Sequence, residues 1–321
     1  MNYLIRFFRL IKNHFGKILS VILFTFLFGL LLFPFSDLSD FISSQVLKLT
    51  NNQIYLQFNK LHLNPFTATV ELDDVSLEMP EIDHLNIKKL MATPSIMALI
   101  SKKPGGEITA NGIMSGQLSI KLSPVSGDKS ENQKSKIEAK LDQISLKELK
   151  QSLNLSFPIS GVLSLNSTSQ VDLSFTEQPD GDLSFQVQKF EMNSTMINLP
   201  DLGALNLPEI KFSSIQGKSK FQNGKYTIES LKLGTTTDDF SGTISGDLNM
   251  LIQNQNGKMT PVVSGYNLKI NLLAKPTFKD RAGFFLNFIS QFQKEEAEGT
   301  RYKFSLISEN PQLPPRMTAL Q

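Results

Sequence analysis

Residues 171–187 read VDLSFTEQPDGDLSFQV, and this stretch indicates the kind of fold that the chain adopts. Apolar and polar residues alternate on both sides of a Gln-Pro-Asp-Gly-Asp turn at 178–182. The alternating apolar residues are Val171, Leu173, Phe175, Leu183, Phe185 and Val187. A period of two puts the apolar side chains on one face of a strand. Two such runs joined by a short turn predict an antiparallel β-hairpin.

The same alternation recurs along most of the chain on either side of this hairpin. Further runs begin near Ile54, Val70, Leu85, Glu107, Ile137, Gly161, Phe221, Leu231, Ile244, Tyr266 and Tyr302. Four short segments have the helical period of 3.6 residues instead: 37–49, 95–102, 145–153 and 281–293. So many strand runs and so few helices predict a mainly β fold, built as a large, mostly antiparallel sheet.

The predicted helices carry local signals of their own. Ser145 and Glu148 have the spacing of a capping box, and Asp280 stands where it could cap the last helix. The segments that begin at Ser95 and Ser145 occupy the same place in two strand–helix–strand units, which suggests a weak internal repeat. The apolar stripe at 284–292 is interpreted as core packing, with a ligand site as the alternative.

Residues 18–35, ILSVILFTFLFGLLLFPF, contain no charge and would span about 27 Å as a helix, close to the hydrocarbon thickness of a bilayer. Four cations precede this run, and residues 1–35 contain no acid. The sequence therefore predicts a transmembrane helix at 18–35, with tail 1–17 in the cytoplasm. A cleaved signal peptide is the alternative, but its apolar core is usually about 7–15 residues long and ends at a small-x-small site.

The part that follows, residues 36–321, is predicted to be one β-rich domain across the membrane. Its first segment, 37–49, has an apolar helical face that we expect to dock on the sheet. A helix lying on the membrane surface is the alternative, although Lys48 is the only basic residue in the segment. The stretch at 123–136, SPVSGDKSENQKSK, has almost no apolar residue and predicts a solvated loop.

The composition excludes several classes of protein. Lys and Arg total 32 against 30 Asp and Glu, and without the four tail cations the balance is 28 against 30. That balance gives no basis for nucleic-acid binding, which needs a clustered basic face. The chain has no cysteine, so disulfides, zinc–thiolate sites and thiol nucleophiles are ruled out. An exported domain without cysteine suits the bacterial periplasm better than a small secreted eukaryotic scaffold.

Motifs for catalysis or metal binding are not found. The chain has three histidines, none in a zinc-binding spacing such as H-E-x-x-H. Residues 217–219, Gly-Lys-Ser, match the end of a P-loop, but Phe212 stands where that motif needs glycine. The acidic pairs at 73–74, 238–239 and 295–296 are interpreted as solvated surface. The sequence therefore predicts no enzyme, no metal site and no cofactor.

Several segments resemble a known family. Residues 33–40 (FPFSDLSD), 53–58 (QIYLQF), 278–285 (FKDRAGFF) and 301–304 (RYKF) with Pro314-Pro315 resemble the type II secretion system protein GspN of the Leptospira and Bdellovibrio type. The match covers most of the chain, and its motifs are structural. The resemblance implies an inner-membrane, periplasm-facing accessory or scaffold subunit of protein export, with other secretion subunits as partners.

Residues 155–163, LSFPISGVL, are more loosely similar to AsmA-like envelope proteins. That resemblance implies a long curved sheet with an apolar groove, and a lipid-binding or lipid-transfer role as the alternative function. The alternation alone does not distinguish an open groove from a closed core. The residues expected to line such a groove are Leu56, Leu72, Ile120, Leu165, Leu173, Phe185 and Leu248.

Overall fold

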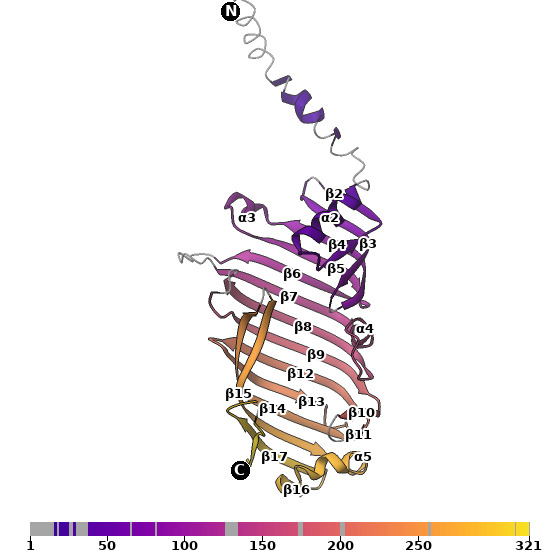
Figure 1. Ribbon diagram of the computed structural model, residues 1–321, viewed down its shortest axis with the longest axis vertical. Coiled ribbons are helices and arrows are strands. Elements are labelled where there is room, and N and C mark those ends of the chain that lie inside the picture. The colour runs from indigo at the N-terminus through magenta and orange to yellow at the C-terminus, as the bar shows by residue number, and fades with distance from the viewer. Residues whose placement is uncertain are drawn as a thin grey trace, which may run out of the picture.

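The computed structural model describes residues 16–17, 19–25, 28–29, 38–64, 66–80, 82–125, 134–172, 176–199, 203–255, 258–311 and 313–320. The described residues form a mainly β protein, as the alternation predicts. Sixteen of their strands build one long sheet whose strands follow one another along the long axis of the molecule (Figure 1). All of the pairings in that sheet are antiparallel.

The sheet is a meander in which consecutive strands are neighbours. Its N-terminal half contains β1 (Tyr55–Gln57), β2 (Lys60–Asn64), β3 (Thr69–Met79), β4 (Ile82–Pro94), β5 (Gly106–Ile113), β6 (Gly116–Pro124), β7 (Lys134–Ser145) and β8 (Ile159–Asp172). Its C-terminal half contains β9 (Asp180–Met192), β12 (Ile210–Gln222), β13 (Lys225–Leu233), β14 (Phe240–Gln255), β15 (Lys258–Ala274), β16 (Gln293–Glu296), β17 (Gly299–Ser308) and β18 (Arg316–Ala319). A separate hairpin, β10 (Thr195–Leu199) with β11 (Gly203–Leu207), is inserted between β9 and β12.

Short helices lie at the ends and edges of this sheet: α2 (Ser39–Leu49), α3 (Ile96–Ile100), α4 (Leu146–Ser152), α5 (Pro276–Asn287) and the 3₁₀ turn η2 (Ser290–Phe292). They fall on the four segments with helical period. Both strand–helix–strand units of the suggested repeat are present, since α3 joins β4 to β5 and α4 joins β7 to β8, and each helix is capped by its serine. In a meander these two connections lie at opposite edges, as Figure 1 shows.

One of the two predicted helix starts is corrected, and the other is confirmed in part. Asp280 is inside α5 rather than at its start; the helix begins with Pro276 at its first position, where the missing N–H costs nothing. The side chain of Ser145 does cap α4 by accepting from Glu148 N. The reciprocal half of the capping box is absent there, because the Glu148 carboxylate accepts from Ser115 Oγ instead.

Some strand boundaries also differ from the prediction. The polar stretch at 123–136 is only partly a connection, since its first two residues end β6 and its last three begin β7; residues 126–133 lie outside those described. The runs around Gly161 and Val171 belong to one strand, β8. Ser167 and Ser169 stand at its apolar-facing positions, which is why the alternation there looks broken.

Regular bulges curve the sheet. Left-handed backbone conformations occur in every second strand from β3 to β9, at Asp74, Gly112, Gln143 and Lys189. The pairing register shifts at the last three of these, and residues three apart, such as Leu72 and Val75 or Leu141 and Ile144, face the same side. A bulge also bends its strand and increases the local twist. The predicted curvature of the sheet therefore has a local cause.

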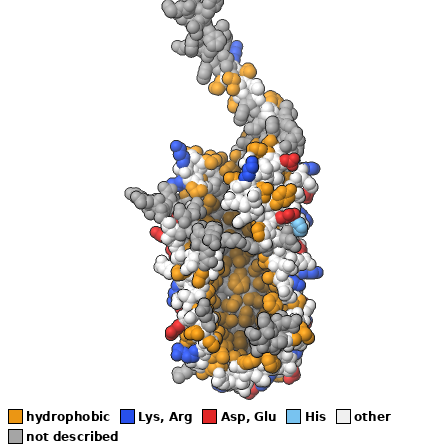
Figure 2. Space-filling view, viewed as in Figure 1, with side chains coloured by type: hydrophobic (Ala, Val, Ile, Leu, Met, Phe, Trp, Pro, Cys, Tyr) orange, Lys and Arg blue, Asp and Glu red, His pale blue; other side chains and the backbone are white. Residues whose placement is uncertain are grey.

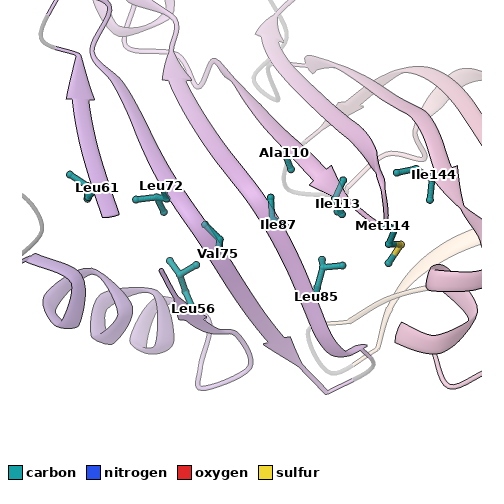
Figure 3. Packing of buried hydrophobic residues seen from close by; sticks show 10 residues of the cluster. All are labelled: Leu56, Leu61, Leu72, Val75, Leu85, Ile87, Ala110, Ile113, Met114 and Ile144. Atoms are coloured by element: carbon teal, nitrogen blue, oxygen red, sulfur yellow. The ribbon is translucent and has the colours of Figure 1, made fainter. Parts of the chain in front are cut away.

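Two closed cores lie at the two ends of the molecule. In the N-terminal core, ten buried side chains of β1 to β7 gather on one side of the sheet (Figure 3), and Ile42 and Val46 of α2 pack against them. The C-terminal core joins Phe278, Ala282 and Leu286 of α5 to buried residues of β15 and β17. The helix predicted at 37–49 thus docks on the sheet, as expected.

Half of the predicted anchor lies outside the described residues. Of 18–35, only 19–25 and 28–29 are described; they are helical and their side chains are exposed. Within the described part of the chain, no helix is long and apolar enough to cross a membrane. Tail 1–17 is described only at its last two residues. The transmembrane helix and the topology stay predictions.

Candidate functional site

The candidate site is one face of the large sheet, which we call the inner face. Directly paired residues of neighbouring strands point to the same side of a sheet. Following these pairs from β2 to β17 gives one row across the sheet, which we call the central row. It consists of Leu61, Leu72, Leu90, Ala110, Leu118, Leu141, Leu165, Phe185, Gly217, Leu231, Ile244, Ile270 and Phe304. Every member of the central row is apolar or glycine.

The opposite, outer face of the same strands is polar. One residue along from the central row, a parallel row of pairs crosses β8 to β17. It consists of Ser164, Gln186, Gln216, Lys232, Thr243, Asn271 and Lys303. The sheet is therefore two-faced: its outer side suits water, and its inner side needs an apolar cover.

Among the residues that the structure describes, apolar cover is present at the two ends of the inner face and is not found in its middle. In the central row, Leu72 and Phe304 belong to the two cores and are buried. Leu165, Phe185, Leu231 and Ile244 belong to neither core, and all four are partly exposed. Figure 2 shows the result as a long hollow with a hydrophobic floor. We call the inner face of β8, β9, β12, β13 and β14 the groove.

The predicted lining residues divide into three groups. Ile120, Leu165, Phe185 and Leu248 lie on the inner face and are exposed or partly exposed. Leu56 and Leu72 are corrected, because they are buried inside the N-terminal core and face no open groove. Leu173 lies outside the described residues.

The long hairpin of β14 and β15 forms a wall of the groove. The register shifts between Asn249 and Met250, and Figure 1 shows the hairpin turning along the long axis of the sheet beyond that point. We call its far part, from Met250 to Val263, the arm. Met250 N donates to Gly224 O (2.9 Å) in the β12–β13 turn, so the arm crosses the end of that hairpin. Gln178, before β9, then holds the arm: its Nε2 donates to Ile252 O (3.0 Å), and Ile252 N donates to its Oε1 (2.8 Å).

Few polar groups reach the inner face of the groove. Ser219 and Tyr226 hydrogen-bond to each other there (2.6 Å), and Ser167 and Ser169 stand on β8. The rows traced through these positions contain no charged residue. A ligand that fits such a surface is long, apolar and uncharged over most of its length.

The acidic pairs have structural partners. Asp239 pairs with Arg281 (2.5 Å), and Glu295 pairs with Lys279 (3.0 Å). Asp238 accepts from the backbone N–H groups of Ser213 (3.0 Å) and Thr235 (2.8 Å). Burial raises the pKa of the Asp238 carboxyl, but these hydrogen bonds outweigh burial and leave its pKa below the ordinary value. These contacts fasten loops and edges of the sheet.

No other arrangement for chemistry is found among the residues that the structure describes. They contain no group of three His, Asp or Glu side chains that could hold a metal ion. His62 and His84 each lie beside one carboxylate, at Asp73 and Glu78. Gly217-Lys218-Ser219 is not a P-loop, because it lies in the middle of strand β12.

The sequence did not reveal the arm or the full extent of the lining. Leu231 and Ile244 occur in recognised strand runs, but their place in the central row depends on pairing between strands. Gln178 was interpreted as a turn residue, and nothing local signals its contact 74 positions further along. In comparisons with protein-family models, with curated proteins and with solved structures, nothing matches this chain.

Proposed function

We propose that this chain is a membrane-anchored groove protein that binds the acyl chains of lipids. In this proposal, residues 18–35 cross a bacterial inner membrane and residues 36–321 lie in the periplasm. One observation carries the proposal: the middle of the inner face is apolar on strand after strand, yet its side chains stay partly exposed. Large apolar surfaces left open in this way mark binding sites, because each Å² exposed to water costs about 25 cal/mol.

The dimensions of the groove suit a lipid tail. Its five strands, spaced about 4.8 Å apart, extend over roughly 19 Å. One leaflet fills half of a hydrocarbon core about 30 Å thick, so an acyl chain in a bilayer extends for about 15 Å. The groove is long enough for such a chain, and burying each CH₂ group is favourable by about 0.8 kcal/mol. Its few hydroxyl groups offer nothing to a charged headgroup, which would stay outside.

The secretion-accessory role rests on the family resemblance alone. A scaffold subunit that contacts other proteins does not require an apolar face that runs the length of the groove. A partnership with the export machinery therefore stays a separate prediction.

The test uses the full chain, purified in mild detergent and examined by mass spectrometry for lipids that copurify. The test variant, F185D/L231D, places two carboxylates on the groove floor. Its matched control, Q186D/K232D, changes the next residue of each strand, on the outer face. We expect the test variant to fold and lose its lipid, because a lipid tail is unfavourable beside unpaired charges. The control should keep its lipid.

Two outcomes would overturn the proposal. If the test variant unfolds while the control stays folded, the middle is a closed core, since buried unpaired charges are severely destabilising. If wild type and both variants carry the same lipid in the same amount, that lipid is not bound in the groove.

A further inference from the structure

The helix α3 exposes its apolar side chains to solvent. Ser95 caps it by accepting from Ala98 N (3.3 Å), and Ala98 is buried. The other four residues are large, apolar and 57–76 % exposed: Ile96, Met97, Leu99 and Ile100. A helix in a soluble setting normally turns its apolar face toward a core. Ala98 is the only buried residue of α3, so the apolar residues form a protrusion.

The turn between β2 and β3 adds to the same protrusion. Phe66 in that turn is 81 % exposed. Thr69, directly after the turn, hydrogen-bonds through its hydroxyl to Thr93 (3.0 Å), near the end of the strand that leads into α3. The two segments therefore lie beside each other at one edge of the sheet. We call Phe66 and the four exposed residues of α3 the apolar tip.

The charges next to the apolar tip are basic. Lys102 and Lys103 follow α3 after Ser101, and the next acid along the chain, Glu107, lies on β5 beyond them. The corresponding corner of Figure 2 carries hydrophobic and basic side chains together. At the other end of the molecule, Phe284 and Phe288 of α5 are also exposed, but the charges near them are balanced: Glu295 pairs with Lys279, and Glu296 pairs with Arg301. The two exposed apolar patches thus differ in the charge around them.

The apolar tip is continuous with the inner face. Ile108 and Ile120 are directly paired, lie on that face near the α3 edge, and are both exposed. Gly106 pairs with Pro94 just below the helix, and Ile108 follows two residues later. An apolar surface therefore extends from α3 along β5 and β6 toward the groove.

We infer that the apolar tip inserts into the interface of a lipid bilayer that contains anionic headgroups. Large apolar side chains bordered by lysines are the pattern of surfaces that sit at this interface. Five side chains are too few for a stable protein–protein interface, which needs about 800 Å² from each partner. The described residues of the N-terminal helix lie beyond the same end of the sheet (Figure 1), so tip and helix can meet one membrane.

The inference deepens the proposed function by naming where a lipid enters: at the tip, past Ile108 and Ile120. The test of the apolar tip does not involve the groove, so this inference and the proposed function can fail separately. The chain has no cysteine, so a single introduced cysteine takes a fluorescent label at one position. The full chain with Met97→Cys, labelled with an environment-sensitive dye, is reconstituted into vesicles of phosphatidylethanolamine and phosphatidylglycerol. Phe288→Cys is the matched control, an exposed apolar position at the other end of the sheet.

We expect the label at position 97 to shift to shorter emission wavelength and to be quenched by spin-labelled lipid, while the label at position 288 does neither. K102Q/K103Q should weaken insertion roughly thirty-fold on these vesicles, because each lysine near an anionic surface contributes about 1 kcal/mol. Neutral phosphatidylcholine vesicles should weaken it similarly.

Three results would overturn the inference. An unquenched label at position 97 means that the tip does not reach lipid. Equal quenching at both positions means that the sheet lies flat on the membrane. Cross-linking of the cysteine at position 97 to a second copy, with quenching absent, would assign the tip to a protein contact.

Discussion

The N-terminal core and the groove are made from the same kinds of residue on the same face of one sheet, yet one is closed and the other is open. In the core, Leu72 and Val75 are buried, and α2 packs against the residues around them. In the groove, Leu231 and Ile244 occupy the same central row and stay partly exposed. Among the described residues, the arm borders the groove, and the side chains of its floor are packed in neither core. What distinguishes the regions is the second layer, not the strands themselves.

The largest change in stability is expected when one buried side chain is truncated in a core, and the same truncation in the groove is the comparison. Phe278 is buried in the C-terminal core and stacks on Phe240 (4.3 Å between ring centroids). Phe278→Ala should lower the free energy of unfolding by about 3–5 kcal/mol, because it leaves a cavity. Leu231→Ala should cost about 1 kcal/mol, because a partly exposed side chain leaves no enclosed void. Urea unfolding of the full chain measures both, and equal losses would mean that the groove is closed.

A second variant fills the groove from beneath. The ring of Phe185 lies over Gly217, and a Cβ at that glycine would come within 2.2 Å of the ring. Gly217→Leu should push the ring into the groove at a cost of about 1–3 kcal/mol for overpacking. The protein should stay folded and carry less lipid. Gly283→Leu, where a Cβ meets nothing within 4 Å, is the control and should leave bound lipid unchanged. Full lipid occupancy in Gly217→Leu would place the ligand elsewhere.

The sequence predicted which face of each strand is apolar, but not what covers that face. Alternation placed Leu165 and Phe185 on one side correctly, and local signals located α3 and α4. Alternation did not predict that residues three apart, such as Leu141 and Ile144, face the same side. A bulge at Gln143 adds one residue there and shifts the period-two pattern. Whether Leu72 is buried and Leu165 is open depends on where α2 and α5 pack, which is a tertiary property.

The stripe at 284–292 shows the same limit inside a helix. It was interpreted as core packing, but Phe284 and Phe288 are exposed, and this part of the interpretation is wrong. The buried face of α5 is formed by Phe278, Ala282 and Leu286 at a spacing of four. Because the helix begins at Pro276, one turn before the expected start, the face that packs also begins earlier.

A smaller effect is expected where the arm is fastened. Gln178→Ala removes both hydrogen bonds to the backbone of Ile252. Each such bond contributes about 0.5–1.5 kcal/mol, so the arm should open more often while the sheet stays intact. Hydrogen exchange measured by mass spectrometry should speed up in residues 250–263 and stay unchanged in β3 and β4. Gln178→Glu keeps an acceptor for Ile252 N and should show part of the effect. Unchanged exchange in the arm would mean that Gln178 does not hold it.

The smallest effect is expected for Asp238, which lies between the groove and the C-terminal core, and it is measured as a change of stability with pH. Asp238 fastens the β13–β14 loop to β12 through Ser213, and next to it Lys275 Nζ donates to Thr236 O (2.7 Å). Asp238→Asn should cost about 1 kcal/mol at neutral pH, because backbone N–H donors favour a carboxylate. Since the folded pKa of Asp238 lies below its unfolded value, near 3.9, this contribution is present above that value and is lost as the pH falls through the folded pKa.

Unfolding of wild type and Asp238→Asn from pH 7 to pH 3 measures that loss, and the difference between them should shrink toward the acid end. Asp247 is the matched control on the outer face of the groove. Hydrogen bonds from Thr227 (2.7 Å) and Lys225 (3.0 Å) lower its pKa too, but these donors are side chains rather than backbone groups. Asp247→Asn should therefore have the same sign of pH dependence and a smaller size. A difference that stays constant down to pH 3 for Asp238→Asn would mean that the charge of Asp238 does not fasten the loop.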